Sequence, residues 1–210
     1  MLSKNHIKTV NSLRVKKYRN EMGLFIAEGE RLIEEILNSS LIAETIYHTS
    51  NWQFNNSQLN HESIEVTEIE MKKISGLSSP SSVLALVKIP EYDIPKNAFH
   101  NSLILAIDDI QDPGNLGTII RLADWFGIDY IFCSEGTVDA FSPKVVQASM
   151  GAISRVKIIY CNLPKTLKNY SETIPIYGTF MAGDDIYNTE LTSKGIIVMG
   201  NEGNGICPEI

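Results

Sequence analysis

From residue 102 onward the chain alternates short apolar runs with helix-like patterns, and this alternation restricts the fold more than any other feature. The predicted strands are LILAIDDI, DYIFCSE, RVKIIYC, IPIYGTF and GIIVMG, and the predicted helices are 116–126, 142–153 and 163–172. Continuous Ile- and Val-rich strands separated by helices are typical of a parallel sheet covered on both faces. The sequence therefore predicts an α/β fold.

The first 90 residues predict a smaller α/β unit. FIAEGERLIEEILNS and EVTEIEMKKISGLSS have helical periodicity, and Gly76 suits a C-cap of the second helix. LIAETIYHT and SSVLALVKI predict strands. Residues 91–101 contain Pro95 and little periodicity, which predicts a linker. The expected domains are 1–90 and 102–210.

Composition excludes several protein classes. Hydrophobic residues make up 43% of the chain, enough for a core, but no apolar run approaches the roughly 18 residues of a membrane helix. The N-terminus lacks the apolar centre of a signal peptide, so we expect a cytoplasmic protein without a membrane partner. The cysteines form no CxxC pair and the histidines show no ligand spacing, so neither a disulfide framework nor a metal site is expected.

Charge is distributed unevenly along the chain. The net charge of −7 argues against a simple electrostatic binder of nucleic acid. The first twenty residues nevertheless hold six cations and no acid: Lys4, Lys8, Arg14, Lys16, Lys17 and Arg19. Two interpretations stay open, a solvated basic helix and an arm that contacts RNA phosphates.

Three loops are candidates for chemistry, because ligands of such sheets bind at the carboxyl ends of the strands. They are QDPGNLG, the turn holding Thr179 and Gly183, and GNEGNG at residues 200–205. GNEGNG lacks the GxGxxG spacing, and the chain has no GxxxxGK[ST] or GxSxG. A dinucleotide fingerprint, a P-loop and a hydrolase elbow are therefore not supported. GNEGNG is either an ordinary glycine turn or a loop that lets a flat ligand approach the backbone.

Two polar residues of the predicted helix have competing interpretations. Asn115 is either a helix cap or a functional amide. Arg121 lies in a largely apolar helix, where its planar fork suits a phosphate or carboxylate. The alternative is an arginine whose stem packs while its head reaches water.

Three segments together resemble a known family. DPGNLGTIIRLADWFGI, SPKVVQASMGAISRVKI and GIIVMGNEGNGICPEI resemble, in order and spacing, the first motif, middle segment and second motif of the SpoU (TrmH-type) RNA ribose 2′-O-methyltransferases of the SPOUT superfamily. FIAEGERLIEEIL resembles the appended substrate-binding domain of that family, which is similar to a ribosomal-protein-type RNA binder.

The resemblance implies a fold, a cofactor, partners and a site. The fold is a parallel α/β sheet with a trefoil knot, the cofactor is S-adenosylmethionine, and the protein is a homodimer whose active site is completed across the interface. The substrate is RNA, with ribosomal RNA favoured and transfer RNA possible. Asn115, Arg121 and Glu202 match catalytic positions, and Arg121 also an RNA contact. The matched wall of the cofactor pocket comprises Thr179, Gly200, Asn201, Glu202 and Gly203.

Arg121 is the matched position whose chemical role needs argument. A guanidinium is effectively always protonated, which makes it a poor base. We therefore hypothesise that Arg121 clamps an RNA phosphate and activates the ribose hydroxyl electrostatically.

The sequence departs from the family pattern at its end. The third motif, a serine- and asparagine-bearing loop followed by a helix, does not follow GNEGNGICPEI. We therefore expect an incomplete knot, weak cofactor binding and little activity for these 210 residues. The alternative to an enzyme is a non-catalytic RNA-binding or dimerising module, and a weaker one is a small-ligand protein unrelated to RNA, against which the basic arm argues.

Overall fold

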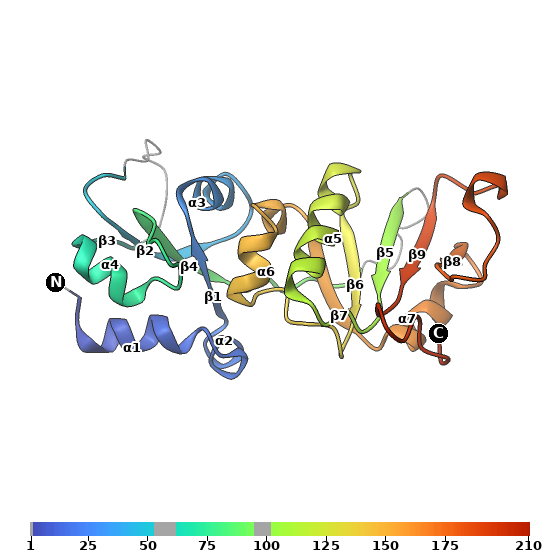
Figure 1. The fold of residues 1–210 in the computed structure, drawn as a ribbon, viewed down its shortest axis with the longest axis horizontal. Helices are drawn as coiled ribbons and strands as arrows, with labels where there is room; N and C mark the ends of the chain where they lie inside the picture. Colours follow the sequence, from blue (N-terminus) through green and yellow to red (C-terminus); the bar gives the residue numbers. More distant parts are fainter. Residues whose placement is uncertain (1, 53–61, 95–101) are drawn as a thin grey trace. The chain divides into compact units, whose positions relative to one another are not determined.

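The computed structural model describes residues 2–52, 62–94 and 102–210 (Figure 1). It divides into two compact units, Met1–Glu91 with Asp139–Ser154, and Tyr92–Val138 with Arg155–Ile210. Residues 139–154 thus group with the first unit, although they lie within the sequence range expected for the second domain. Residues 95–101 of the expected linker lie outside the described residues.

The first unit contains a four-stranded sheet in the order β1-β4-β2-β3. β4 is antiparallel to β1 and β2, and β2 is parallel to β3. The strands are β1 (Leu24–Glu28), β2 (Ala43–His48), β3 (Glu62–Glu65) and β4 (Val83–Lys88). Its helices are α1 (Lys4–Ser12), α2 (Lys16–Met22), α3 (Glu30–Leu37), α4 (Glu68–Ile74), α6 (Pro143–Ala148) and the 3₁₀ turn η2 (Ala152–Ser154).

The prediction of one helical segment beginning at FIAEG was wrong at its start. Leu24–Glu28 is a strand, and all five of its residues are buried. Its continuous apolar run runs directly into the helical pattern that follows, and periodicity alone does not separate the two. Gly29 makes the break with a φ of 119°, a backbone conformation that favours glycine. The helical face of α3 is confirmed, since Leu32, Ile33, Ile36 and Leu37 are buried.

Residues 139–154 are packed into the first unit by apolar and ionic contacts. α6 packs against β1, and the rings of Phe25 and Phe141 lie 5.2 Å apart. The expected helix start is confirmed, because Ser142 caps α6 and Pro143 is its first residue.

The end of α4 differs from the prediction at Gly76. Ser75, with an extended backbone, is the C-cap. The amide of Gly76 instead donates to the Glu28 carboxylate at 2.9 and 3.0 Å. A Cβ at Gly76 would lie 1.8 Å from Nη1 of Arg14, so a close approach explains this glycine better than a helix cap does.

The second unit contains a five-stranded sheet in the order β7-β6-β5-β9-β8, with every pair parallel. This confirms the predicted parallel α/β sheet, whereas the trefoil knot stays a prediction. The strands are β5 (Leu103–Ile107), β6 (Tyr130–Ser134), β7 (Lys157–Cys161), β8 (Ile176–Gly178) and β9 (Gly195–Met199). The helices are α5 (Pro113–Trp125), α7 (Leu163–Tyr170) and the 3₁₀ turn η3 (Ile186–Asn188).

α5 buries one apolar face within the second unit. Its N-cap differs from the residue that was predicted. Leu116, Ile119, Ile120 and Ala123 are buried. The N-cap is Asp112, whose carboxylate accepts from the amide of Asn115 at 2.9 Å. Asn115 therefore lies in the first turn, and the interpretation of its side chain as the cap was wrong. No helix among the described residues is long and apolar enough to cross a membrane.

We predict that Glu70 contributes stability that acid removes. Its carboxylate accepts from the amides of Thr67 (3.0 Å) and Leu2 (2.7 Å). These bonds, with that of Thr67 the largest effect, lower the pKa of Glu70 to about 2. The carboxylate is favoured in the folded state, so its contribution is complete above the unfolded pKa of about 4.3 and is lost as pH falls toward about 2.

Thermal unfolding as a function of pH measures this contribution. Glu70→Gln should lower Tm at pH 7, and its difference from wild type should shrink between pH ~4.3 and ~2. Glu68→Gln, in the same helical turn, is the control, because the Glu68 side chain makes no hydrogen bond among the described residues. A Tm difference for Glu70→Gln that is independent of pH would contradict the prediction.

Candidate functional site

The three predicted loops leave the same edge of the second sheet. β5 pairs with β9 and β9 with β8, all parallel, so the carboxyl ends of these strands lie together. After β5 come Asp108 and Asp109, and after β9 comes the glycine loop, residues 200–205. This edge holds the candidate active site.

The glycine loop is a tight, internally bonded turn. The backbone amide and carbonyl of Asn201 pair with the carbonyl and amide of Gly205, both at 2.9 Å. The Asn201 Oδ1 accepts from the amides of Gly203 at 2.8 Å and Asn204 at 3.1 Å. A Cβ at Gly200 would lie 2.2 Å from the carbonyl carbon of Gly205. Close backbone packing therefore requires glycine at position 200.

The structure brings together two of the predicted catalytic residues. Nδ2 of Asn115, in the first turn of α5, donates to Oε1 of Glu202 in the glycine loop. Both residues are exposed. An amide and a carboxylate from distant parts of the chain thus form one polar group at the carboxyl edge of the sheet, where each can also meet a ligand.

Arg121, the third predicted catalytic residue, is not in this contact. It lies six residues after Asn115, about 9 Å further along the helix axis and about 120° around it. Its side chain is exposed and makes no hydrogen bond or ion pair with any described residue. Arg121 is therefore a free cation on the surface of α5 rather than a buried, paired one.

Thr179 is hydrogen-bonded to strand β9 of the second sheet. Its amide (3.0 Å) and its hydroxyl (3.1 Å) both donate to the carbonyl of Val198, two residues before Gly200. The hydroxyl therefore fixes the end of β8 to β9. The structure places Thr179 beside the strand that leads to the glycine loop.

Two cavities border this edge within the second unit. One, of about 470 Å³, is lined in part by Asp108, Asp109 and Asn201, with the thiols of Cys161 and Cys207. Burial raises the pKa of both thiols, so neither is an activated nucleophile. The other, of about 750 Å³, is lined in part by Gly178, Phe180, Val198 and Ile206. Among the described residues no three His, Cys, Asp or Glu side chains are grouped to hold a metal ion.

Sequence reasoning missed Asp108 and Asp109. Asp108 is buried, and its Oδ2 accepts from the amide of Cys207 at 2.8 Å. The carbonyl of Asp109 accepts from Nδ2 of Asn201 at 2.7 Å. The available signal was the pair of acids directly after an apolar strand, where a parallel sheet places its ligand-binding loops.

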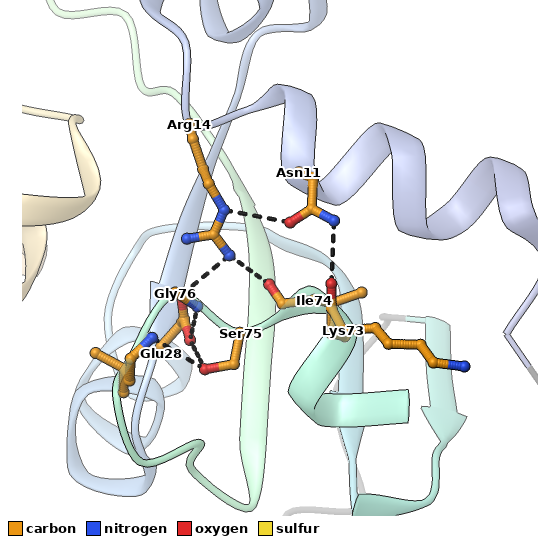
Figure 2. A network of polar contacts seen from close by, with 8 residues as sticks. Asn11, Arg14, Glu28, Lys73, Ile74, Ser75 and Gly76 are labelled. Atoms are coloured by element: carbon orange, nitrogen blue, oxygen red, sulfur yellow. Dashed lines mark hydrogen bonds and ion pairs between the residues drawn. The ribbon is translucent and has the colours of Figure 1, made fainter. Parts of the chain in front are cut away.

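In the first unit, Arg14 belongs to a polar network that holds α1 against α4 (Figure 2). Its Nε donates to Oδ1 of Asn11 at 3.3 Å and its Nη2 to the carbonyl of Ile74 at 2.6 Å. Nη2 also lies 4.0 Å from Glu28. The side chain is 30% exposed, so Arg14 is mainly structural but retains an accessible part.

The remaining cations of the basic arm differ in exposure. Lys4, Lys8, Lys16 and Lys17 are exposed. Arg19 is buried, with Nε and Nη2 donating to Oδ2 of Asp139 at 3.1 and 2.5 Å. Its Nη1 donates to the carbonyl of Leu13 at 2.8 Å. The expectation that Arg19 contacts RNA is corrected, because its guanidinium is enclosed and already bonded.

Known families and curated proteins match both parts of the chain. The SpoU rRNA Methylase family matches residues 102–210, and the MRM3-like substrate binding domain matches residues 4–85. The chain is 29% identical to the 23S rRNA (guanosine(2553)-2′-O)-methyltransferase RlmP of Bacillus subtilis, over 95% of this chain and 80% of that protein. It is 32% identical to the mitochondrial rRNA methyltransferase 3 of Xenopus laevis, over 72% of this chain and 38% of the longer relative.

Solved structures resemble the whole described chain. A protein of the TrmH family from Porphyromonas gingivalis, described as an RNA methyltransferase, superposes with a TM-score of 0.91 at 38% identity, covering 100% of this chain and 84% of the other. An AdoMet-bound rRNA methyltransferase from Sinorhizobium meliloti gives a TM-score of 0.84 at 27% identity, covering 100% and 82%.

We predict that the two glycines of the loop respond differently to a methyl group. In Gly200→Ala the Cβ would meet the backbone of Gly205 at 2.2 Å, and displacing backbone should cost about 1–3 kcal/mol of stability. In Gly203→Ala the nearest atom is Oδ1 of Asn201 at 3.5 Å, an ordinary contact, so the change should stay within about 0.5 kcal/mol. Denaturant unfolding measures both, and equal losses would contradict this account of the loop.

Proposed function

This chain belongs to the SpoU rRNA methylase family, and we propose that it transfers a methyl group from S-adenosylmethionine to a ribose 2′-hydroxyl of ribosomal RNA. The observation that carries the proposal is the contact of Asn115 with Glu202 at the carboxyl edge of a parallel sheet. The names of the curated relatives support rRNA as the substrate class. A non-catalytic module is not favoured, because these relatives are described as methyltransferases.

The residues beside β8 and β9 fit the cofactor. The cavity of about 750 Å³ falls in the size range of small-molecule sites, and its lining includes the apolar side chains of Phe180, Val198 and Ile206. A flat adenine can pack on such a surface. Thr179 directly follows the cavity residue Gly178, and Gly200 lies two positions after the cavity residue Val198. We propose that Thr179, Gly200 and the loop from Asn201 to Gly203 extend this surface and form the wall of the cofactor site. S-adenosylmethionine, when bound, supplies an electrophilic methyl group.

The protein's own side chains would orient the ribose. Asn115 can donate to an oxygen and Glu202 can accept from a hydroxyl. Arg121 is protonated, exposed and without a partner among the described residues, so it can bind an RNA phosphate next to the target ribose. That charge favours a developing alkoxide, while the hydroxyl proton leaves to the Glu202 carboxylate or to water and not to the arginine.

Methyl transfer from labelled S-adenosylmethionine to ribosomal RNA, with mapping of the modified ribose, tests the proposed function against the sequence-based expectation of little activity. Arg121→Ala should lower kcat/KM by about 100- to 1,000-fold through loss of an electrostatic contact. Cofactor affinity should be unchanged, and Lys194→Ala, the loss of another exposed cation, is the control. If an inflection in the pH–rate profile disappears only in Arg121→Ala, the arginine acts as a base. That result would contradict the hypothesis that Arg121 clamps an RNA phosphate.

We propose that the first unit binds the RNA through the exposed lysines of α1 and α2, with Arg14 contributing its accessible part. A match to a substrate-binding domain over residues 4–85 supports this role. Each phosphate contact releases counterions, so the number of contacts appears in the salt dependence of binding.

Salt titrations of RNA binding distinguish surface contacts from structural cations. Replacing Lys4 and Lys8 together with serine should make the negative slope of log K against log salt shallower by about 1.4–1.8. Arg19→Met should leave the slope of the folded protein unchanged but cost about 3–5 kcal/mol of stability, because it leaves Asp139 without its buried partner. A reduced slope in Arg19→Met would contradict its structural role.

We also propose a cytoplasmic homodimer. Beside Arg121, α5 exposes Leu122 (48%) and Trp125 (84%), and its C-cap Phe126 is also exposed (72%). Apolar side chains three and four positions apart on one helix face are typical of a contact surface. Trp125→Glu should therefore shift sedimentation equilibrium toward monomer, whereas Ile69→Glu, at a comparably exposed residue in the first unit, should not.

A further inference from the structure

We propose that Asn201 is a positioning residue, whose carboxamide ties the glycine loop to the loop after β5 and thereby sets Glu202 against Asn115. The effect of Asn201 on catalysis rests on the proposed function. Its effect on the positions of Glu202 and Asn115 does not depend on that function. Asn201 was placed above in the wall of the cofactor site. The proposal adds a second role, in which its side chain holds two loops of the protein together.

Both ends of the Asn201 carboxamide are engaged. Its oxygen accepts from two amides inside the glycine loop, those of Gly203 and Asn204. Its nitrogen donates outward to the carbonyl of Asp109 at 2.7 Å. The oxygen therefore shapes the turn, and the nitrogen fixes the turn to a second loop. Glu202 is the next residue, so its backbone position follows from that of Asn201.

The acceptor is itself held in place. Asp109 has a φ of 55°, a conformation that few residues other than glycine adopt and that aspartate tolerates. Its amide donates to Oγ of Ser134 at 2.9 Å. Its Oδ1 accepts at 2.7 Å from Nε2 of Gln111, which also donates to the carbonyl of Gly136 at 2.6 Å. The Asp109 carbonyl therefore has a fixed direction.

The same loop positions the partner of Glu202. Three residues after Asp109, Asp112 caps α5 and bonds the amide of Asn115. The bond between Asn201 and Asp109 therefore joins the segment that carries Glu202 to the segment that carries Asn115. The amide of Cys207 donates to the side-chain oxygen Oδ2 of Asp108 at 2.8 Å and so attaches the far side of the glycine loop. A substitution at Asn201 leaves this bond intact. We therefore expect such a substitution to shift the position of Glu202 without unfolding the loop.

Asn201→Asp removes only the hydrogen bond from Asn201 to the carbonyl of Asp109. The carboxylate keeps an oxygen for the amides of the turn but presents an oxygen, instead of a donor, to the carbonyl of Asp109. Asn204→Asp introduces the same charge in the same turn, and the Asn204 side chain makes no hydrogen bond among the described residues. It is therefore the matched control.

The first readout is the ¹⁵N–¹H₂ signal of the Asn115 side chain, which needs no activity and is assigned by its loss in Asn115→Ser. In Asn201→Asp it should move toward its position in Glu202→Ala, where the contact is absent. In Asn204→Asp it should stay at the wild-type position. A wild-type signal in Asn201→Asp would overturn the proposal.

The second readout is a double-mutant cycle in methyl transfer at saturating cofactor. Asn201→Asp should lower kcat on the order of 100-fold, the effect of misplacing a group by about an ångström. In the Glu202→Ala background the same substitution should change kcat less than about 3-fold, because its effect passes through Glu202. Effects that multiply would overturn the proposal. An inactive wild type with the predicted spectral shift would reject the proposed function and leave the positioning role standing.

Discussion

The position of β5 between β6 and β9 controls the layout of the candidate site. Parallel pairing on both sides of β5 brings the segments after three strands to one edge. Side chains there bond across loops instead of along the chain, as between Asn201 and Asp109. The contact of Asn115 with Glu202 depends on this register, because the two residues are 87 positions apart in sequence.

Burial determines which cationic side chains of the protein are accessible to an RNA phosphate. An enclosed guanidinium needs partners, and Arg19 has them in Asp139 and the carbonyl of Leu13. Arg14 is intermediate, bonded on one side and partly exposed. Lys8 and Arg121 have exposed heads, so a phosphate can reach them. Six cations that look equivalent in the N-terminal sequence therefore divide between structure and surface.

The candidate site could be predicted only in part. Asn115 and Glu202 were identified by a resemblance, and their contact with each other is visible only in the structure. The sequence could not reveal that Asp112, rather than Asn115, caps α5, because both residue types favour that role. Asp109 was missed because its part in the site is played by a backbone carbonyl, which leaves no side-chain pattern to recognise. For Arg121 the sequence left two interpretations open, a guanidinium that binds a phosphate or carboxylate and one whose stem packs while its head reaches water. Its exposure depended on which helix face the sheet covers.

The sequence by itself determined the alternating α/β order, the parallel sheet and the family, because apolar periodicity and motif order are properties of the chain. Tertiary structure alone decided that Leu24–Glu28 is a strand and that residues 139–154 pack with the first unit. It also decided that Arg19 is internal and that Asn201 bonds to Asp109. These outcomes depend on partners remote in sequence, and the free energy of burying or pairing a group is set by those partners rather than by its neighbours in the chain.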